Sequence, residues 1–222
     1  MIEFKTYGIA RRRIGTDGHG VTDLVALAGC PLRCAYCLNR ELLANGNPRS
    51  VSPEELLEDL MNEACYFVAT GGGATFGGGE PTLQREALER FFEIKPDWMR
   101  VSIETSLQTD EETIRSLIPR VDEWIVDVKS LSEDVYETYA RGGDGSYAVM
   151  RRNLAALAES VPEKCLVRVP TIPAYKGAKA AEIEADLLRK EGFERIDLFE
   201  YVVRGKKTER KEKSERILKG LY

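Results

Sequence analysis

Three cysteines lie within eight residues of one another in the first fifth of the chain. Cys30, Cys34 and Cys37 have the spacing C-x3-C-x2-C. Three thiolates on one short loop can converge on a single soft metal centre. Iron–sulfur cubanes usually take four cysteine thiolates, so three would leave one iron free to bind a small molecule. The spacing therefore predicts a cluster with one open coordination position.

Two other interpretations of this loop stay open. Structural zinc prefers four ligands, and the fourth would be His19, Cys65 or Cys165, none of which lies in a paired-ligand motif. Alternatively, the three cysteines are simply buried. Cys65, on a helical run, and Cys165, at the start of an apolar strand, are expected to be small buried hydrophobic residues outside any site.

The elements that must position the cysteine loop alternate between short β-type runs and helical runs. Many of the β-type runs lack in/out alternation, as expected of parallel strands buried on both faces. The strand candidates are residues 23–28, 74–76, 101–103, 124–128, 166–170 and 196–199, with residues 2–9 as an additional edge strand. A capping box with proline in the first turn predicts a helix from Ser52, and the pattern recurs at residues 109–112. Further helices are expected at 83–94, 147–158 and 180–190.

Six strand–helix units imply right-handed crossovers and one parallel sheet, and six is short of the eight that close a full barrel. We therefore expect an α/β fold, a partial, open (βα)6 TIM-like barrel. A doubly wound open sheet is the alternative. Both architectures place function beyond the carboxyl ends of the strands.

Polar residues of unusual type follow these strands, as that rule requires. They are the cysteine loop after the first strand, Gly77–Glu80 after the second, Glu104 and Thr105 at the third, Asp127 and Lys129 at the fourth, Arg168 late in the fifth, and Glu200 with Tyr201 after the sixth. Because parallel strands end at the same edge of a sheet, we expect these side chains to lie at one rim of the barrel.

The cysteine loop, with Tyr36 before its last cysteine, resembles the signature of radical S-adenosylmethionine (SAM) enzymes. The run Gly78-Gly79-Glu80-Pro81 resembles their second motif, which binds the SAM amino group. The resemblance implies a [4Fe–4S] cluster on Cys30, Cys34 and Cys37 as the catalytic centre, with SAM on the open iron. One electron from the reduced cluster would then cleave SAM to methionine and a 5′-deoxyadenosyl radical. Backbone N–H groups of residues 31–35 are expected to help hold the cluster.

Within this superfamily the chain is most similar to glycyl-radical-enzyme activating enzymes, of the pyruvate formate-lyase activating type. The similarity extends over roughly residues 15–205. It rests on Asp17-Gly18-His19-Gly20 (their DGPG), Asn39, Glu104-Thr105 (their Asp-Thr), Asp127-Val128-Lys129 (their DxK) and Arg168. The chain departs from the pattern at His19, Thr22 and Ala26, which bears on the identity of the substrate.

The resemblance also implies a set of SAM-binding residues, each with a structural alternative. The set is Tyr36, Gly78, Gly79, Glu80, Glu104, Thr105, Asp127, Lys129 and Arg168. Glu80 would accept from the SAM ammonium. Tyr36 would contact the adenine or only pack. Glu104, Thr105 and Asp127 would hold a monovalent cation near the SAM carboxylate, or form a hydrogen-bonded rim.

Lys129 and Arg168 supply positive charge to the same expected site. They would face the carboxylate or ribose of SAM, or instead form salt bridges with Asp127 or Glu104. The sequence alone does not choose between these two arrangements.

Three classes of function remain open from the sequence. The first is an activating enzyme that abstracts hydrogen from a glycine of a partner glycyl radical enzyme, reduced by a one-electron donor such as flavodoxin or ferredoxin. The second is a radical SAM enzyme acting on a small molecule or a ribosomal peptide. The third is a zinc-binding, non-enzymatic adaptor.

Composition sets the remaining expectations for this 222-residue chain. Its 43% hydrophobic and 31% charged residues are typical of a soluble globular protein, and no apolar run approaches the ~20 residues of a membrane span. Without a secretion signal, the expected location is cytoplasmic. The net charge is −5, but residues 204–222 carry +5. We expect a core domain at 1–205, a basic C-terminal helix or tail at 206–222, and no nucleic-acid partner.

Overall fold

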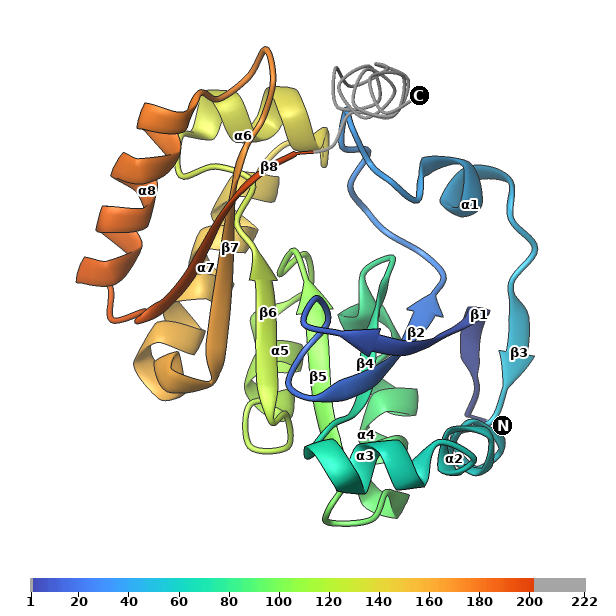
Figure 1. The fold of residues 1–222 in the computed structure, drawn as a ribbon. Coiled ribbons are helices and arrows are strands. Elements are labelled where there is room, and N and C mark those ends of the chain that lie inside the picture. Colours follow the sequence, from blue (N-terminus) through green and yellow to red (C-terminus); the bar gives the residue numbers. More distant parts are fainter. Residues whose placement is uncertain (1, 202–222) are drawn as a thin grey trace, which may run out of the picture.

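The computed structural model describes residues 2–201, so the expected tail at 206–222 lies outside the described residues. Eight strands form one sheet in the order β3-β1-β2-β4-β5-β6-β7-β8 (Figure 1). The strands from β2 to β8 run parallel. They are β2 (Val21–Leu27), β4 (Gly73–Gly78), β5 (Arg100–Thr105), β6 (Glu123–Asp127), β7 (Cys165–Thr171) and β8 (Arg195–Glu200). All six expected strands are therefore confirmed, and the α/β sheet is an open, partial barrel, with β3 and β8 at its two edges.

The opening segment is a strand, but its expected place at the edge was wrong. β1 (Phe4–Ile14) is longer than expected and pairs antiparallel with β2 on one side and with β3 (Arg49–Val51) on the other. β3 is three residues long and largely exposed, so it carries no hydrophobic pattern that would reveal it in the sequence.

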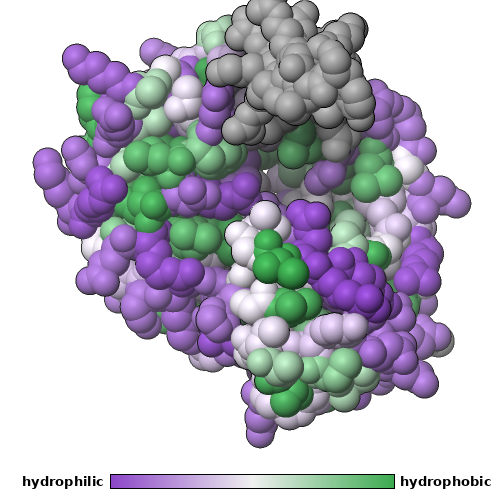
Figure 2. All heavy atoms as spheres, in the orientation of Figure 1, coloured by the Kyte–Doolittle hydropathy of each residue, from purple (hydrophilic) through white to green (hydrophobic). Residues whose placement is uncertain are grey.

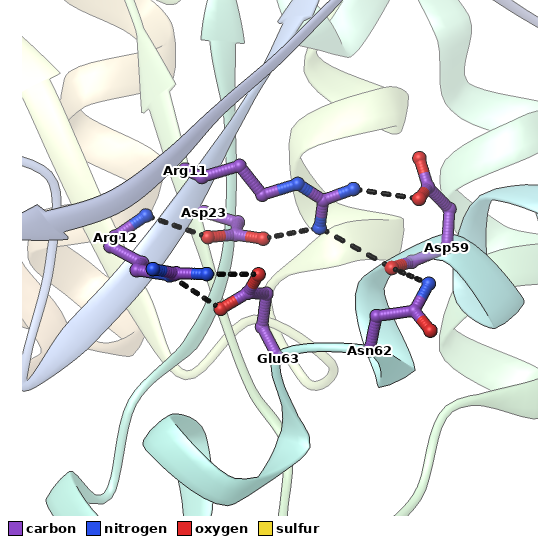
Figure 3. Close-up of polar contacts among 6 residues, drawn as sticks. All are labelled: Arg11, Arg12, Asp23, Asp59, Asn62 and Glu63. Atoms are coloured by element: carbon purple, nitrogen blue, oxygen red, sulfur yellow. Dashed lines mark hydrogen bonds and ion pairs between the residues drawn. The ribbon is translucent and has the colours of Figure 1, made fainter.

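A network of charged residues fixes β1 to β2 and to the two helices that follow β3 (Figure 3). The fully buried Asp23, on β2, accepts from Arg11 Nη1 at 2.8 Å and from the backbone N–H of Arg12 at 2.9 Å. The register of β1 shifts between Ala10 and Arg13, and Arg12 has a φ of 53°, so the carboxylate satisfies an N–H at an irregular point of the ladder. Strand β2 leads directly into the cysteine loop, which this network helps to place.

Arg11 and Arg12 extend the network to two helices. Arg11 Nη2 donates to Asp59 at 2.7 Å, and Arg12 Nε donates to Glu63 at 2.8 Å. Glu63 stands just before α3, so β1 is tied to the helical layer beside it.

The helices cover the outer face of the sheet and return the chain to the start of each strand (Figure 1). They are α1 (Arg40–Asn45), α2 (Pro53–Met61), α3 (Ala64–Thr70), α4 (Arg85–Ile94), α5 (Glu111–Leu117), α6 (Glu133–Ala140), α7 (Ser146–Ser160) and α8 (Ala178–Lys190), with 3-10 turns η1 (Pro81–Gln84) and η2 (Pro162–Lys164). The capping box at Ser52 is confirmed. In the second pattern Asp110, one residue later than Thr109, caps α5 by accepting from Thr113. The short helix α3 contains the helical run expected around Cys65, whereas α1 and α6 were not expected.

The two isolated cysteines have different environments. Cys165 is fully buried at the start of β7, as expected. Cys65 is exposed on α3, so its expected burial was wrong. The seven-residue helix α3 buries only Phe67, and two positions along a helix is a rotation of about 200°, which turns Cys65 away from the core.

The surface in Figure 2 is mostly hydrophilic, with hydrophobic residues gathered over the β7–β8 side. Leu198, on the edge strand β8, is 44% exposed. Among the helices of residues 2–201, none has the length and apolarity that crossing a membrane requires.

Candidate functional site

A cavity of about 280 Å³ lies at the carboxyl ends of the parallel strands. It collects residues from the carboxyl ends of all six parallel strands, because these ends meet at one edge of the sheet. Of the residues singled out from the sequence, it is lined by Cys30, Cys34, Cys37, Asn39, Gly78, Gly79, Glu104, Thr105, Asp127, Lys129, Arg168, Glu200 and Tyr201. The expected rim is therefore present as a single cavity.

The cysteine loop is hydrogen-bonded to the carboxyl end of α6. The N–H of Arg33 donates to Ala140 O at 2.8 Å, and the N–H of Ala35 donates to Tyr139 O at 2.9 Å. These two of the loop's N–H groups are thus engaged by the protein and are not free to face a cluster. Together they also satisfy two of the free carbonyl groups at the end of a helix.

The three thiols differ in their burial. Cys34 is buried and Cys30 and Cys37 are half-buried. Burial raises the pKa of the Cys30 thiol to about 12, against a backbone hydrogen bond from Leu32, and burial also raises the pKa of Cys34. Such thiols lose their protons readily only when a metal takes the thiolate.

The glycines after β4 allow this strand end to approach the cysteine loop closely. A Cβ on Gly79 would lie 2.1 Å from the carbonyl oxygen of Gly29, so only glycine fits there. Gly78, with a φ of 89°, presents its carbonyl to Asn39 Nδ2 at 2.9 Å. The N–H of Glu80 in turn donates to Gly29 O at 2.8 Å. The two sequence motifs are therefore one packed unit.

Glu80 lies below the cavity rather than in its lining. Its side chain is fully buried, and Oε1 accepts from Thr82 Oγ1 at 2.8 Å and from Thr105 Oγ1 at 2.6 Å. Oε2 accepts from the backbone N–H and the hydroxyl of Ser106, at 2.9 and 2.8 Å. Thr105 and Ser106 do line the cavity, so they stand between the carboxylate and the open space.

Four charged side chains from β5, β6 and β7 form a connected row in the cavity wall. Lys129 Nζ lies 2.7 Å from Asp127 Oδ2. Arg168 lies 2.6 Å from Glu104 Oε1 and 3.5 Å from Asp127 Oδ1. The salt-bridge alternative considered from the sequence is thus the arrangement that the structure has.

The row perturbs the titration of its own members. Burial, and after it repulsion from Asp127, raises the pKa of Glu104 to about 7, although Arg168 opposes this. Burial acts to raise the pKa of Asp127 too, but Lys129 and Arg168 outweigh it and lower the pKa. Burial acts to lower the pKa of Lys129, but Asp127 outweighs it, so the ammonium stays charged.

Tyr36 packs outside the lining of the cavity. Its ring meets Tyr139 and Tyr175 edge-on, with centroids 6.2 and 5.8 Å apart. This is the packing alternative considered for Tyr36.

Ser106 belongs to the polar strand end expected after the third strand, but several other lining residues were not singled out from the sequence, among them Leu32, Leu38, Leu43 and Phe199. The Arg168 guanidinium lies over the Phe199 ring, 5.0 Å from its centroid. A signal for Phe199 was present, because it stands two residues before Tyr201 and alternate residues of a strand share a face.

The donor set fits a group larger than one ion. No group of three His, Cys, Asp or Glu side chains among residues 2–201 is arranged to hold a single metal ion. The three free thiols nevertheless line the same cavity. Three soft ligands beside open space suit an iron–sulfur cluster with one iron facing the cavity.

Comparison with known proteins identifies a family to which this site geometry can be related. A family model described as the Radical SAM superfamily matches residues 24–195. Pyruvate formate-lyase-activating enzyme of Staphylococcus aureus (strain USA300) is 33% identical over 130 residues, which are 54% of this chain and 52% of that protein. The match thus spans about half the length of the curated relative.

Solved structures are similar in fold. Streptococcus suis SuiB has a TM-score of 0.62 at 14% identity, over 88% of this chain and 45% of that one. A structure of anSMEcpe with bound AdoMet has a TM-score of 0.58 at 19% identity, over 81% and 53% of the two chains. At these identities the likeness shows the fold alone.

Proposed function

The chain belongs to the radical SAM superfamily, and from this premise we propose that it is a glycyl-radical-enzyme activating enzyme. The observation that carries the proposal is the single cavity that joins Cys30, Cys34 and Cys37 to the charged row from β5, β6 and β7. Bound at these cysteines, a [4Fe–4S] cluster would reduce SAM and yield the 5′-deoxyadenosyl radical that takes a hydrogen atom from a partner's glycine.

The protein's own residues would hold and orient SAM. The glycine run brings Gly78 and Gly79 to the cavity, where backbone groups can reach the methionine part of SAM. Lys129 and Arg168 offer positive charge for its carboxylate, and the hydroxyls of Thr105 and Ser106 couple the cavity to the Glu80 carboxylate.

A monovalent cation would complete this arrangement. Asp127 Oδ1 is buried and lacks a hydrogen-bond partner among the described residues. Its oxygen, with those of Glu104 and Thr105, is the type of ligand that hard cations prefer. We therefore place the cation between β5 and β6.

One feature favours the activating-enzyme subtype, and a second is compatible with it. One is the likeness to the pyruvate formate-lyase-activating enzyme of S. aureus. The other is an open sheet, which leaves a side through which a loop of a folded partner can enter.

The family match over residues 24–195 supports a core domain at 1–205.

A peptide-modifying radical SAM enzyme is the second candidate. The similar folds include SuiB bound to its precursor peptide SuiA, at a TM-score of 0.58 and 16% identity. An open barrel suits a peptide as well as a glycine loop.

One experiment separates these candidates. Anaerobically reconstituted protein is mixed with SAM, dithionite and the glycyl radical enzymes encoded by its own source. The proposal expects 5′-deoxyadenosine together with a glycyl radical signal in electron paramagnetic resonance, and neither with Cys34→Ala. Cleavage of SAM without a glycyl radical on any partner would favour the peptide or small-molecule alternative.

A further inference from the structure

A second cavity, of about 370 Å³, lies against the cysteine loop. It shares Leu32, Cys34, Cys37 and Leu43 with the first cavity. Its other lining residues come from the loop itself, from α1 and from the end of α6: Arg33, Arg40, Ala44 and Arg141. Two of the three candidate cluster ligands therefore face two different spaces. We call this second space the arginine groove.

The three guanidinium groups of the groove are exposed and are held by backbone carbonyls. Arg33 Nη1 donates to Cys30 O at 2.7 Å, and Arg40 Nη2 donates to Cys34 O at 2.8 Å. Arg141 Nε donates to Thr138 O at 3.4 Å. Carbonyl partners orient these side chains without neutralising them.

No carboxylate among residues 2–201 lies within ion-pair distance of these three arginines. The described ion pairs involve other arginines, such as Arg11, Arg85 and Arg115. Glu41, which adjoins Arg40 in the sequence, accepts from Asn45 instead. The groove therefore carries about three uncompensated positive charges.

This positive charge contrasts with the net charge of residues 1–203. The net charge of the whole chain is −5 and that of residues 204–222 is +5, which leaves −10 for residues 1–203. A compact cationic patch on an acidic body attracts an anionic partner to one place and repels it elsewhere.

We propose that the arginine groove is the docking site of an acidic one-electron carrier protein that reduces the cluster. This inference rests on the proposed function, because it concerns the cluster on Cys30, Cys34 and Cys37. The groove reaches Cys34 and Cys37 without crossing the cavity assigned to SAM, so donor and SAM can be bound together. Each encounter moves one electron: the carrier is oxidised by one electron, the cluster goes from [4Fe–4S]2+ to [4Fe–4S]+, and no atom is exchanged.

The first test compares two reductants on one variant. In Arg33→Gln/Arg40→Gln/Arg141→Gln, glutamine removes the charge and keeps a polar side chain. Reduced flavodoxin should drive SAM cleavage with a half-saturating concentration raised at least about tenfold. Dithionite needs no docking, so the dithionite-driven rate should stay within about twofold of the wild-type rate.

The matched control removes the same number of charges elsewhere. The control positions are exposed and lie near the amino ends of β6 and β8, away from the cysteine loop. They are Arg120, Arg189 and Lys190. The triple Gln variant at these positions should keep wild-type rates with both reductants. An Arg→Lys triple variant of the groove should retain most of the flavodoxin-driven rate.

The second test measures binding without turnover. Oxidised flavodoxin immobilised on a sensor should bind wild-type protein more weakly as salt rises, and should bind the groove variant at least about tenfold more weakly at low salt. Unchanged binding and unchanged flavodoxin-driven cleavage in the groove variant would overturn the proposal.

Two further outcomes have distinct meanings. Normal SAM cleavage with both reductants, but loss of the glycyl radical on the partner enzyme, would reassign the groove to the protein substrate and overturn electron-donor docking. Absence of dithionite-driven cleavage in the wild-type protein would instead refute the proposed function itself, while the binding measurement would still test the groove.

Discussion

Arg168, on β7, lies 2.6 Å from the carboxylate of Glu104, on β5, and so bridges the width of the intervening strand β6. Asp127, at the end of β6, lies 3.5 Å from the same guanidinium. One arginine thus faces two carboxylates. Since the two carboxylates repel each other, one of them ionises less readily than usual.

The first prediction concerns the ionisation of Glu104. Burial and Asp127 raise its pKa from 4.5 to about 7, so the folded state binds this proton more tightly than the unfolded chain does. Its contribution to stability is fully present below about pH 4.5 and is lost as the pH rises through about 7. Glu104→Gln is neutral at every pH and lacks that loss. Its melting temperature should therefore rise relative to that of the wild type between about pH 5 and 8.

Circular dichroism of the cofactor-free proteins across this pH range provides the measurement. Glu58→Gln, at an exposed position of α2, is the control, and its melting temperature should keep a constant difference from the wild type. A constant difference for Glu104→Gln as well would mean that Glu104 does not change its protonation in this range.

The six parallel strands could be predicted because each is a short run of β-forming residues followed by a chemically unusual strand end. The antiparallel β1–β3 ladder could not. β3 has no buried residue, and β1 is held to β2 by a half-buried ion pair between Arg11 and Asp23, which are 12 positions apart. Such pairings are set by tertiary contacts that leave no local periodicity.

The sequence predicts which residues form the candidate site better than it predicts the contacts that they make. The cysteines and the charged row follow strands, and the sheet topology alone brings them together. The contacts of Glu80 and Tyr36 could not be predicted, because they depend on Ser106, Tyr139 and Tyr175. Nothing in the sequence near Glu80 or Tyr36 indicates these partners.

The second prediction concerns the cluster. Wild-type protein purified without oxygen should contain about four iron and four sulfide per chain. Cys34→Ala should lose the brown absorbance and most of the iron, because Cys34 is the most buried of the three thiols. Cys65→Ala and Cys165→Ala are the matched controls and should keep the wild-type iron content. Stoichiometric zinc without iron would contradict a cluster.

The third prediction concerns Glu80. Glu80→Gln replaces one acceptor oxygen by an NH2 group, which cannot accept the hydrogen bonds that Thr105 Oγ1 and the N–H of Ser106 now donate to the carboxylate. The free energy of unfolding should fall by about 1–3 kcal/mol, the range for a buried bond to a charged group. SAM affinity, measured by calorimetry well below the melting temperature, should weaken by a similar amount while the iron content is kept. Wild-type SAM affinity in a destabilised variant would assign Glu80 a structural role only.

The last prediction concerns a buried ion pair behind the charged row. Lys176 Nζ lies 2.6 Å from Glu184 Oε2 and donates to the backbone carbonyl of Lys129 at 2.9 Å. Glu184 Oε1 accepts from Ser130 Oγ at 2.6 Å and from the N–H of Leu131 at 2.8 Å. The pair therefore fixes the segment that carries Lys129.

Removing one partner of this pair should cost far more than removing both charges. Lys176→Met leaves the Glu184 carboxylate buried without a cation, and urea unfolding of the cofactor-free protein should show a loss of about 3–5 kcal/mol. Lys176→Met/Glu184→Gln should recover part of that loss, because the amide oxygen still accepts from Ser130 and Leu131. Lys179 is exposed on α8, the helix that carries Glu184, and Lys179→Met should change the free energy of unfolding by about 0.5 kcal/mol or less. Equal losses in the single and the double variant would show that the unpaired carboxylate is not the origin of the cost.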